Sequence, residues 1–375
     1  MRLEDEQRMV RQALDNALSG ISEDPAMTAR VLAQSKGETP MKRKLPMAVI
    51  VLIVLLITTA TAVAAGWFAW NRGLEDQLRV TDEIKSTFSG TGLFEHPEMS
   101  VTQNGVTVSL DSCVVVESSA YIAFRVSGYQ PRSNMQPAFD ETEIICSAFD
   151  NASGGTGSSF FDGLVTGPDG RAMFTDGTPW SEDRQAQYTD ERGDMIYIIS
   201  INVDGSSLIG QEISIELRNL GYYFNKWGDV QVEVEGTWAF EWQLTGTDAC
   251  YELHDVSLPL GDTGITLTDL RLSPISIEVT LQNVPADRVD GDEDLLVYEP
   301  YICCLRRRDE TIDYWVANGG SFGLLDDGYR MSFALDRVVI PSEIESIFFS
   351  FVNAGLPDLP LIPGTDTHAV EVKIR

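Results

Sequence analysis

A run of 26 residues without a charged side chain, Leu45 to Trp70, constrains the fold of this chain more than any other feature. A helix rises about 1.5 Å per residue, and about 20 apolar residues cross a hydrocarbon core of about 30 Å. Three basic residues, at 42–44, directly precede the run, and basic residues favour the cytoplasmic side. The run predicts one transmembrane helix at 45–70, with residues 1–44 in the cytoplasm and the C-terminal part outside the cell.

Two other interpretations fit this run less well than a membrane anchor. The segment Ala62-Val63-Ala64 resembles a signal-peptide cleavage site. However, a long stretch precedes the run, and its apolar part exceeds the roughly 7–15 residues usual in such peptides. A buried core helix would be shorter or would carry a polar face. We therefore expect a retained anchor, with cleavage as the alternative.

The acidic excess of the chain lies almost wholly beyond this run. The chain carries 57 Asp and Glu against 27 Lys and Arg, a net charge of −30, whereas residues 1–44 hold seven acidic and eight basic residues. A strongly acidic surface repels the phosphates of nucleic acids and of anionic lipids. Direct nucleic-acid binding by the external part is therefore not expected. Calcium or cationic cell-wall partners remain open, because charge alone does not select among them.

The cysteines are odd in number and irregularly spaced: Cys113, Cys146, Cys250, Cys303 and Cys304. No CxxC or zinc-ligand spacing occurs, and a disulfide-rich external domain would carry more cysteines in pairs. We expect buried free thiols that pack as small apolar groups, with one disulfide between Cys113 and Cys146 as the alternative. Because successive side chains on a strand alternate, Cys303 and Cys304 are expected to point to opposite faces.

From about residue 98 onward, short strand patterns alternate with turns. Asn104-Gly105 is the turn of a strand–turn–strand pattern at Val101–Leu110. Further strands are expected at Val114–Val116, Tyr121–Val126, Ile144–Phe149, Met195–Val203, Ile213–Leu217, Val230–Glu235 and Trp238–Leu244. No long helical period intervenes, so the pattern predicts a mainly β fold with antiparallel sandwiches.

The strand series restarts near residue 250. Gly105-Val-Thr-Val-Ser-Leu is echoed by Gly264-Ile-Thr-Leu-Thr-Asp, and the strand ending the first series is echoed by one at Ala369–Ile374. We predict two antiparallel, immunoglobulin-like β-sandwich modules, at 98–247 and 250–375, although strand alternation alone can produce such an echo.

Residues 71–97 are predicted to form a juxtamembrane connector. Glu75 to Phe88 shows an amphipathic helical pattern, with Leu78, Ile84 and Phe88 as its apolar positions. Such a helix would hold the following module away from the membrane.

Residues 1–44 contain two short helical patterns separated by a Gly and Pro break. Leu14 and Leu18 recur at helical spacing in the first pattern, and Met27, Val31 and Leu32 form an apolar edge in the second. So short a segment cannot bury a sizeable core alone. These five residues are therefore the candidate partner-binding residues, with a solvated tail as the alternative.

No motif of an enzyme, a cofactor site or a metal site is recognisable in this chain. The three histidines, His96, His254 and His368, have no second metal-type ligand at useful spacing, and no GxSxG, HExxH, P-loop or GxGxxG occurs in the required context. We expect no enzymatic activity, no catalytic residue, no cofactor and no bound metal.

Two loops are the nearest approach to a site. The acidic loop Asp287–Asp294 alternates Asp290, Asp292 and Asp294, but it lacks the full calcium-binding loop that ends in a glutamate, so a solvated hairpin tip is expected. A glycine-rich stretch, Ser153–Gly177, is either a recognition surface or a plain loop over the core. Its aromatic residues are Phe160, Phe161 and Phe174, with Trp180 and an acidic cluster following.

Two groups of segments carry a family resemblance. The first comprises Leu14-Asp-Asn-Ala-Leu-Ser-Gly-Ile-Ser-Glu-Asp-Pro25, Arg30-Val-Leu-Ala and Lys42-Arg-Lys-Leu, and the second comprises Gly105–Cys113 and Ala120–Val126. They resemble bacterial single-pass membrane proteins of Gram-positive gut anaerobes that carry an extracytoplasmic domain of unknown function. The resemblance covers most of the chain and transfers no site residue.

This resemblance implies the architecture of a membrane anti-sigma factor, whose cytoplasmic segment holds an extracytoplasmic-function sigma factor. The cytoplasmic part here is short and lacks the zinc-binding His/Cys pattern of better-known anti-sigma factors. The leading expectation is a non-enzymatic membrane regulator whose external modules sense an unidentified ligand. The alternative is an anchored cell-envelope binding or adhesion module with a passive N-terminal tail.

Overall fold

The computed structural model describes residues 72–149, 153–167, 171–181, 184–225, 228–284, 286–287, 296–297, 299–325, 328–352, 362 and 368–375, all within one compact unit. The predicted partner-binding residues, the anchor at 45–70 and the loop carrying Asp290, Asp292 and Asp294 lie outside the described residues. Within the described ranges, no helix has both the length and the apolar character needed to cross a membrane.

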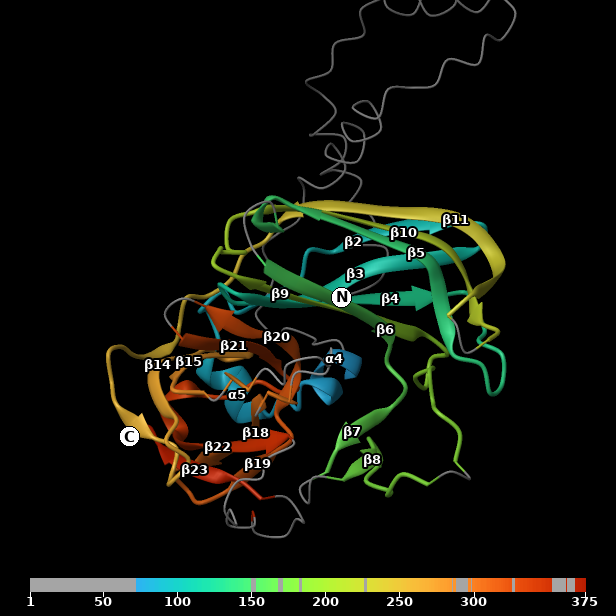
Figure 1. Ribbon diagram of the computed structural model, residues 1–375. Coiled ribbons are helices and arrows are strands. Elements are labelled where there is room, and N and C mark those ends of the chain that lie inside the picture. Colours follow the sequence, from blue (N-terminus) through green and yellow to red (C-terminus); the bar gives the residue numbers. More distant parts are fainter. Residues whose placement is uncertain are drawn as a thin grey trace, which may run out of the picture. The chain divides into compact units, whose positions relative to one another are not determined.

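The fold is mainly β and is built from antiparallel sheets, as the alternating pattern predicted (Figure 1). The first core lies between two sheets. One sheet has the strand order β1-β3-β4-β9-β6, with β2 also paired to β3, and the other has the order β11-β10-β5. Their bounds are β1 Phe94–Glu95, β2 Met99–Gln103, β3 Val106–Val115, β4 Ser119–Ser127, β5 Pro137–Cys146, β6 Ser153–Phe160, β9 Met195–Asp204, β10 Glu212–Tyr223 and β11 Val230–Gln243.

Alternation along each strand places one apolar face of each sheet in this first core. On β10, Ile213, Ile215 and Leu217 are buried while the residues between them are not. Opposite them, Phe124 of β4 packs against Phe240 of β11 with ring centroids 5.0 Å apart. The two sheets therefore form a sandwich-like pair around a continuous core.

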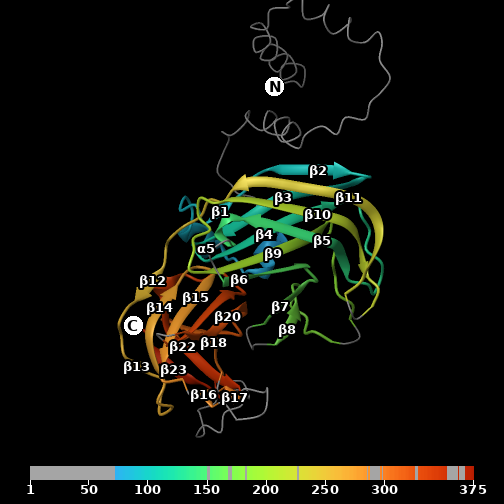
Figure 2. The ribbon, with the colours of Figure 1, turned by 45° about the horizontal axis from the view of Figure 1, so that its top comes forward.

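The second core repeats this arrangement (Figure 2). One sheet has the order β12-β14-β15-β21-β20, with β13 paired to β14, and the facing sheet has the order β19-β18-β22-β23. Their bounds are β12 Tyr251–Leu253, β13 Leu258–Pro259, β14 Thr266–Leu272, β15 Ser276–Gln282, β18 Glu299–Arg307, β19 Ile312–Tyr314, β20 Ala317–Leu325, β21 Gly328–Leu335, β22 Ile344–Val352 and β23 Val370–Lys373.

The remaining elements are short. Two small hairpins pair β7 with β8 and β16 with β17. Their bounds, with those of two 3-10 turns, are β7 Leu164–Thr166, β8 Ala172–Phe174, β16 Ala286–Asp287, β17 Leu296–Val297, η1 Ser147–Phe149 and η2 Pro341–Glu343.

The strand orders of the two cores correspond one to one, apart from the additional β19. In chain order, β1, β2, β3 and β4 match β12, β13, β14 and β15, while β6 and β9 match β20 and β21. The echoed segments of the sequence lie on the matching strands β3 and β14. Both strands also carry a bulge, at Asp111 and at Thr268, where the register with the next strand shifts. When the two strands are aligned on these bulges, Asp111 matches Thr268. The sequence echo, which matches Gly105 with Gly264, would instead match Asp111 with Leu270, two residues further along.

The outer faces of the two long sheets contact each other, and matching strands meet: β9 contacts β21, and β6 contacts β20. We call this region the inter-core contact. One part of it is polar and made of small groups. The Ser118 and Ser276 hydroxyls lie 3.2 Å apart, and the Asn202 side-chain amide donates to the Ser332 carbonyl at 3.2 Å.

The connector is part of this contact. It forms two short helices, α4 (Arg72–Gln77) and α5 (Asp82–Thr87), where the sequence pattern indicated one. Its apolar positions were predicted correctly, because Leu78, Ile84 and Phe88 are all buried. They join a third apolar cluster with side chains of both cores, including Tyr121. The single amphipathic helix expected from the sequence is therefore two short helices that pack against both cores.

Three strand predictions also need correction. Val114–Val116 is not a separate strand, since β3 continues through Val115. Ile144–Phe149 is only partly a strand, because β5 ends at Cys146 and a 3-10 turn follows. The two strands expected between residues 230 and 244 are one strand, β11.

All five cysteines are free, so the alternative of a Cys113–Cys146 disulfide is not observed. The prediction that Cys303 and Cys304 point to opposite faces is wrong. The register of β18 with β22 shifts between Ile302 and Cys304, which makes Cys303 the extra residue of a β-bulge. A bulge interrupts the alternation of side chains, and both cysteines share one apolar cluster.

Candidate functional site

A cavity of about 590 Å³ is lined by residues of both cores at the inter-core contact. We call it the inter-core cavity. The outer face of the β14–β15–β21 sheet forms its floor, and loops of the first core form its wall. The residues that line it are Glu117, Ser118, Asp204, Gly205, Ser206, Ser207, His254, Asp269, Leu270, Arg271, Glu278, Val279, Thr280 and Arg330.

Strand alternation explains why the floor is charged. Ile277, Val279 and Leu281 are buried toward the second core, so the intervening Glu278 and Thr280 lie on the outer face of β15. The wall is set by tight turns. The Val116 N–H donates to the Ser119 carbonyl at 2.9 Å, closing the β3–β4 turn that carries Glu117 and Ser118.

Arg271 is the central cation of this cavity. Its guanidinium pairs with Glu117 of the first core, and its Nε lies 3.2 Å from Oε1 of Glu252. Burial alone would lower the pKa of Arg271, but its hydrogen bonds to Glu117 and Cys250 outweigh burial and the pKa is raised. Arg271 is therefore permanently charged and joins the two cores by an ion pair.

A second cation, Arg330 of β21, lies 3.6 Å from the Asp204 carboxylate at the end of β9. Both arginines of the cavity come from the second core, and each contacts an acidic residue of the first. In both ion pairs, therefore, the second core supplies the positive charge and the first core supplies the negative charge.

Glu278 is the least satisfied charged group of the inter-core cavity. Its Oε1 is buried and has no hydrogen-bond partner among the described residues. Burial raises the pKa of Glu278, while a hydrogen bond from Ser118 and the charge of Arg271 partly oppose that effect. A buried carboxylate that lacks a full set of partners gains free energy from any donor placed beside it.

The lining has more carboxylates than guanidinium groups. Four acidic residues face two arginines, and the arginines are engaged by Glu117 and Asp204. The remaining two carboxylates belong to Asp269 and Glu278. His254 adds an imidazole 3.7 Å from Asp269. The cavity can therefore accept a polar molecule that brings positive charge and hydrogen-bond donors.

A second cavity, of about 360 Å³, lies beside the connector. Arg79, which follows α4, pairs with Asp336 at 3.1 Å on its wall. Burial lowers the pKa of Arg79 to about 10, and the charge of Arg337 acts in the same direction. The Arg79–Asp336 ion pair on the wall of this cavity therefore links the connector to the second core.

Of the two loops that the sequence singled out, the structure describes most of the glycine-rich one. Phe160 and Phe174 are buried packing residues, whereas Trp180 is 49% exposed. In the described part of the chain, no group of three or more His, Cys, Asp or Glu residues is arranged to hold a metal ion. Arg271 and Glu278 were not among the residues predicted from the sequence. The only signal was a charged residue at an outward strand position, which most exposed strands also show.

Comparisons with known proteins show only a distant structural similarity. No protein-family model and no curated protein matches the chain. A solved structure described as the conserved domain protein from Bacillus anthracis is similar, with a TM-score of 0.43 and 11% sequence identity. The similarity covers 78% of this chain and 92% of that one. Likeness at this level carries no argument about function.

Proposed function

We propose that this protein is a non-enzymatic, single-pass membrane regulator with the architecture of an anti-sigma factor. In this proposal residues 45–70 span the membrane, and the helix pair carrying Leu14, Leu18, Met27, Val31 and Leu32 binds a cytoplasmic partner, an extracytoplasmic-function sigma factor. The two β cores lie outside the cell as immunoglobulin-like sandwich modules and bind the signal.

One observation supports this proposal most: the inter-core cavity and the connector belong to the same inter-core contact. Residues of both cores line the cavity, and the buried side chains of α4 and α5 lie in the apolar cluster that both cores share. A ligand that binds one arrangement of the two cores better than another shifts the population between them. Such a shift would change the packing of the connector, because its buried side chains contact both cores.

The chemistry of the cavity favours a small polar ligand with a cationic amine. Asp269 and Glu278 supply negative charge that no arginine of the cavity neutralises by an ion pair. Ser206, Ser207 and Thr280 supply hydroxyl groups around them. Arg271 and Arg330 orient the carboxylates and leave room for a ligand carboxylate or hydroxyl.

Calorimetric titration of the full chain in detergent micelles tests the ligand class. The probes are a diamine, an amino sugar and an amino-acid amide, each beside its N-acetylated counterpart. Binding of an amine is expected to weaken by about tenfold in Asp269→Asn and Glu278→Gln, since each removes one charge-assisted contact. The matched control is Glu241→Gln on the exposed face of β11. Equal binding of the acetylated probes would contradict the amine assignment.

Affinity capture with residues 1–44 as bait in native-cell lysate tests the cytoplasmic function. The expected result is specific recovery of a sigma factor that is lost in Leu14→Asp/Leu18→Asp. The control, Gln12→Asp, adds charge at a polar position of the same segment. Recovery of nothing, where a known anti-sigma bait succeeds, would contradict the regulator hypothesis.

A second candidate, an anchored envelope-binding module, is favoured by exposed aromatic side chains. Trp180 is 49% exposed, and Phe224 and Phe322 are each 54% exposed. Exposed aromatic rings suit stacking against sugar rings of a wall polymer. Co-sedimentation with purified cell wall, lost in Trp180→Ala and Phe224→Ala, would favour this function over the regulator.

A further inference from the structure

Two adjacent thiols, Cys303 and Cys304, lie together on the β18 bulge in the second core. Both are at most 1% exposed. They share an apolar cluster with Phe348, Ile362 and Ala369. Because Cys303 is the extra residue of the bulge, the strand does not separate the two side chains onto opposite faces.

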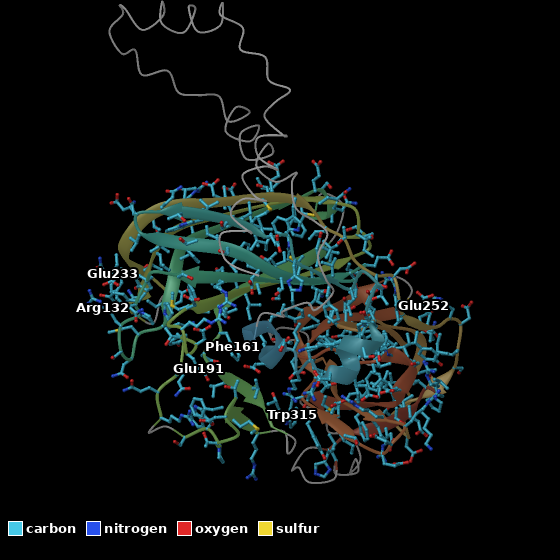
Figure 3. All side chains as sticks on the ribbon, turned by 180° about the vertical axis from the view of Figure 1, so that it is seen from behind. Arg132, Phe161, Glu191, Glu233, Glu252 and Trp315 are labelled. Carbon is cyan, nitrogen blue, oxygen red and sulfur yellow. The ribbon has the colours of Figure 1, made fainter. Side chains whose placement is uncertain are left out.

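The surroundings distinguish the two sulfur atoms. The Cys303 thiol is within hydrogen-bond reach of the Cys304 sulfur and of the Phe348 carbonyl, the latter at 3.4 Å. The Cys304 sulfur accepts from Cys303 and from the backbone N–H of Trp315, a residue held at φ 51° (Figure 3). Cys304 is therefore the better nucleophile, and Cys303 is the neighbour that can resolve its oxidation.

The pKa values follow this geometry. The hydrogen bond from Cys303, the Trp315 N–H and the charge of Arg337 together lower the pKa of Cys304, against the opposing effect of burial. The same hydrogen bond, together with burial, raises the pKa of Cys303. Burial also raises the pKa of Cys250, which is the most accessible of the five thiols.

We propose that Cys303 and Cys304 are a reversible oxidation site that a peroxide converts to an internal disulfide between neighbouring residues. The Cys304 thiolate attacks the O–O bond, forming a sulfenic acid and releasing hydroxide, which takes up a proton to become water. The Cys303 sulfur then attacks the Cys304 sulfur, and the S–O bond breaks. The hydroxyl group leaves with the Cys303 proton as a second water. The two thiols lose two electrons, and the peroxide gains them.

Burial selects the oxidant class. A bulky disulfide needs room at the attacked sulfur, and these sulfur atoms lie in a packed apolar cluster. Hydrogen peroxide is small and uncharged, so it needs less room beside the sulfur atom than a disulfide does. The resolving thiol is in hydrogen-bond contact, so the sulfenic acid condenses before it is oxidised further.

Adjacency also makes the product easy to reduce. Neighbouring Cα atoms are about 3.8 Å apart, whereas disulfide-bonded cysteines usually have Cα atoms about 4.4–6.8 Å apart. A disulfide outside its preferred geometry is strained and is readily reduced. The site therefore has the reversibility of a sensor, unlike a structural crosslink.

The test exposes the full-length protein, in detergent micelles, to stoichiometric hydrogen peroxide. Remaining thiols are alkylated under denaturing conditions, and the peptides are analysed by mass spectrometry. The expected product is a peptide containing residues 303 and 304 that has lost two hydrogen atoms, resists alkylation and is restored by dithiothreitol. It should form about tenfold faster than any oxidation product of Cys250, because reactivity follows thiolate character.

Single substitutions separate the two roles. In Cys303→Ser, Cys304 should stop at a sulfenic acid that dimedone traps, whereas in Cys304→Ser, Cys303 should stay reduced. Cys250→Ser is the control and should leave disulfide formation unchanged. Since the main measurement uses the unsubstituted chain, a variant that fails to fold does not remove the test. Oxidation of Cys250 with Cys303 and Cys304 still alkylated would overturn the proposal, as would direct over-oxidation of Cys304 without a disulfide.

Discussion

The hydroxyl group of Tyr121 in the first core donates a hydrogen bond of 2.7 Å to the backbone carbonyl of Leu335 in the second. Tyr121 is fully buried, and its hydroxyl also accepts from the Asn318 amide at 3.2 Å. One side chain thus joins β4, β20 and β21 at the centre of the inter-core contact.

Replacing Tyr121 with Phe is expected to reduce the free energy of unfolding by about 1–3 kcal/mol, because the carbonyl of the buried residue Leu335 loses its donor. Urea denaturation of residues 68–375, followed by fluorescence, measures this change. Tyr223→Phe alters an exposed ring and should stay within about 0.5 kcal/mol of the unsubstituted protein. Equal effects of the two substitutions would contradict the role given to the Tyr121 hydroxyl.

The connector should contribute to global stability. Leu78 is fully buried in the apolar cluster shared by both cores, so Leu78→Ala is expected to cost about 2–5 kcal/mol of unfolding free energy. Glu83→Ala, on the exposed side of α5, serves as the control and should change little. An unchanged urea midpoint in Leu78→Ala would show that the connector does not contribute to global stability.

Glu278 should make stability depend on pH. Burial raises its folded-state pKa above the unfolded value, so the unfolded chain releases the Glu278 proton first as pH rises. The Glu278 contribution to stability is therefore fully present below the unfolded pKa, about 4.3, and is lost as pH rises through the folded pKa.

Glu278→Gln removes this titration. The variant should be more stable than the unsubstituted protein at pH 7, and the difference should shrink as pH falls to about 4, below the reference value for Glu. Urea titrations at both pH values, with Glu241→Gln as the exposed control, measure the difference. A gain in stability that is independent of pH would show that packing, rather than ionisation, is responsible.

Glycine at position 221 is required by a close approach of two strands. A Cβ there would lie 1.9 Å from the Gln231 carbonyl oxygen, so no small side-chain movement can relieve the clash. Gly221→Ala is expected to cost about 1–3 kcal/mol or more. Gly155→Ala, on the open edge strand β6, meets no atom within 4 Å and should be close to neutral. Thermal unfolding of both variants compares the two positions.

Local signals predicted much of the β structure. Asn104 and Gly105 both adopt positive φ, at 47° and 83°, in the turn that joins β2 and β3. The β9 strand was anticipated to within one residue, because Met195–Val203 is a nearly continuous apolar run. The matching strand orders of the two cores extend the echo noticed in the sequence, whereas the module boundaries at 247 and 250 remain a prediction.

Non-local packing produced the features that the sequence did not indicate. Strand β6 is rich in glycine and serine, without an apolar alternation to mark it. The connector turned out to be buried because its apolar edge meets residues more than 200 positions away, such as Ala334. The Cys303 bulge depends on the register between β18 and β22, and no local pattern sets that register.

Because matching strands meet in the inter-core contact, the two cores face each other as the two halves of a symmetric dimer do. Two separate chains joined by such a contact would come apart on dilution. When one chain carries both halves, the segment that links them sets their effective concentration. That concentration does not depend on how much protein is present. The inter-core cavity therefore exists in every copy of the molecule, however dilute the protein is.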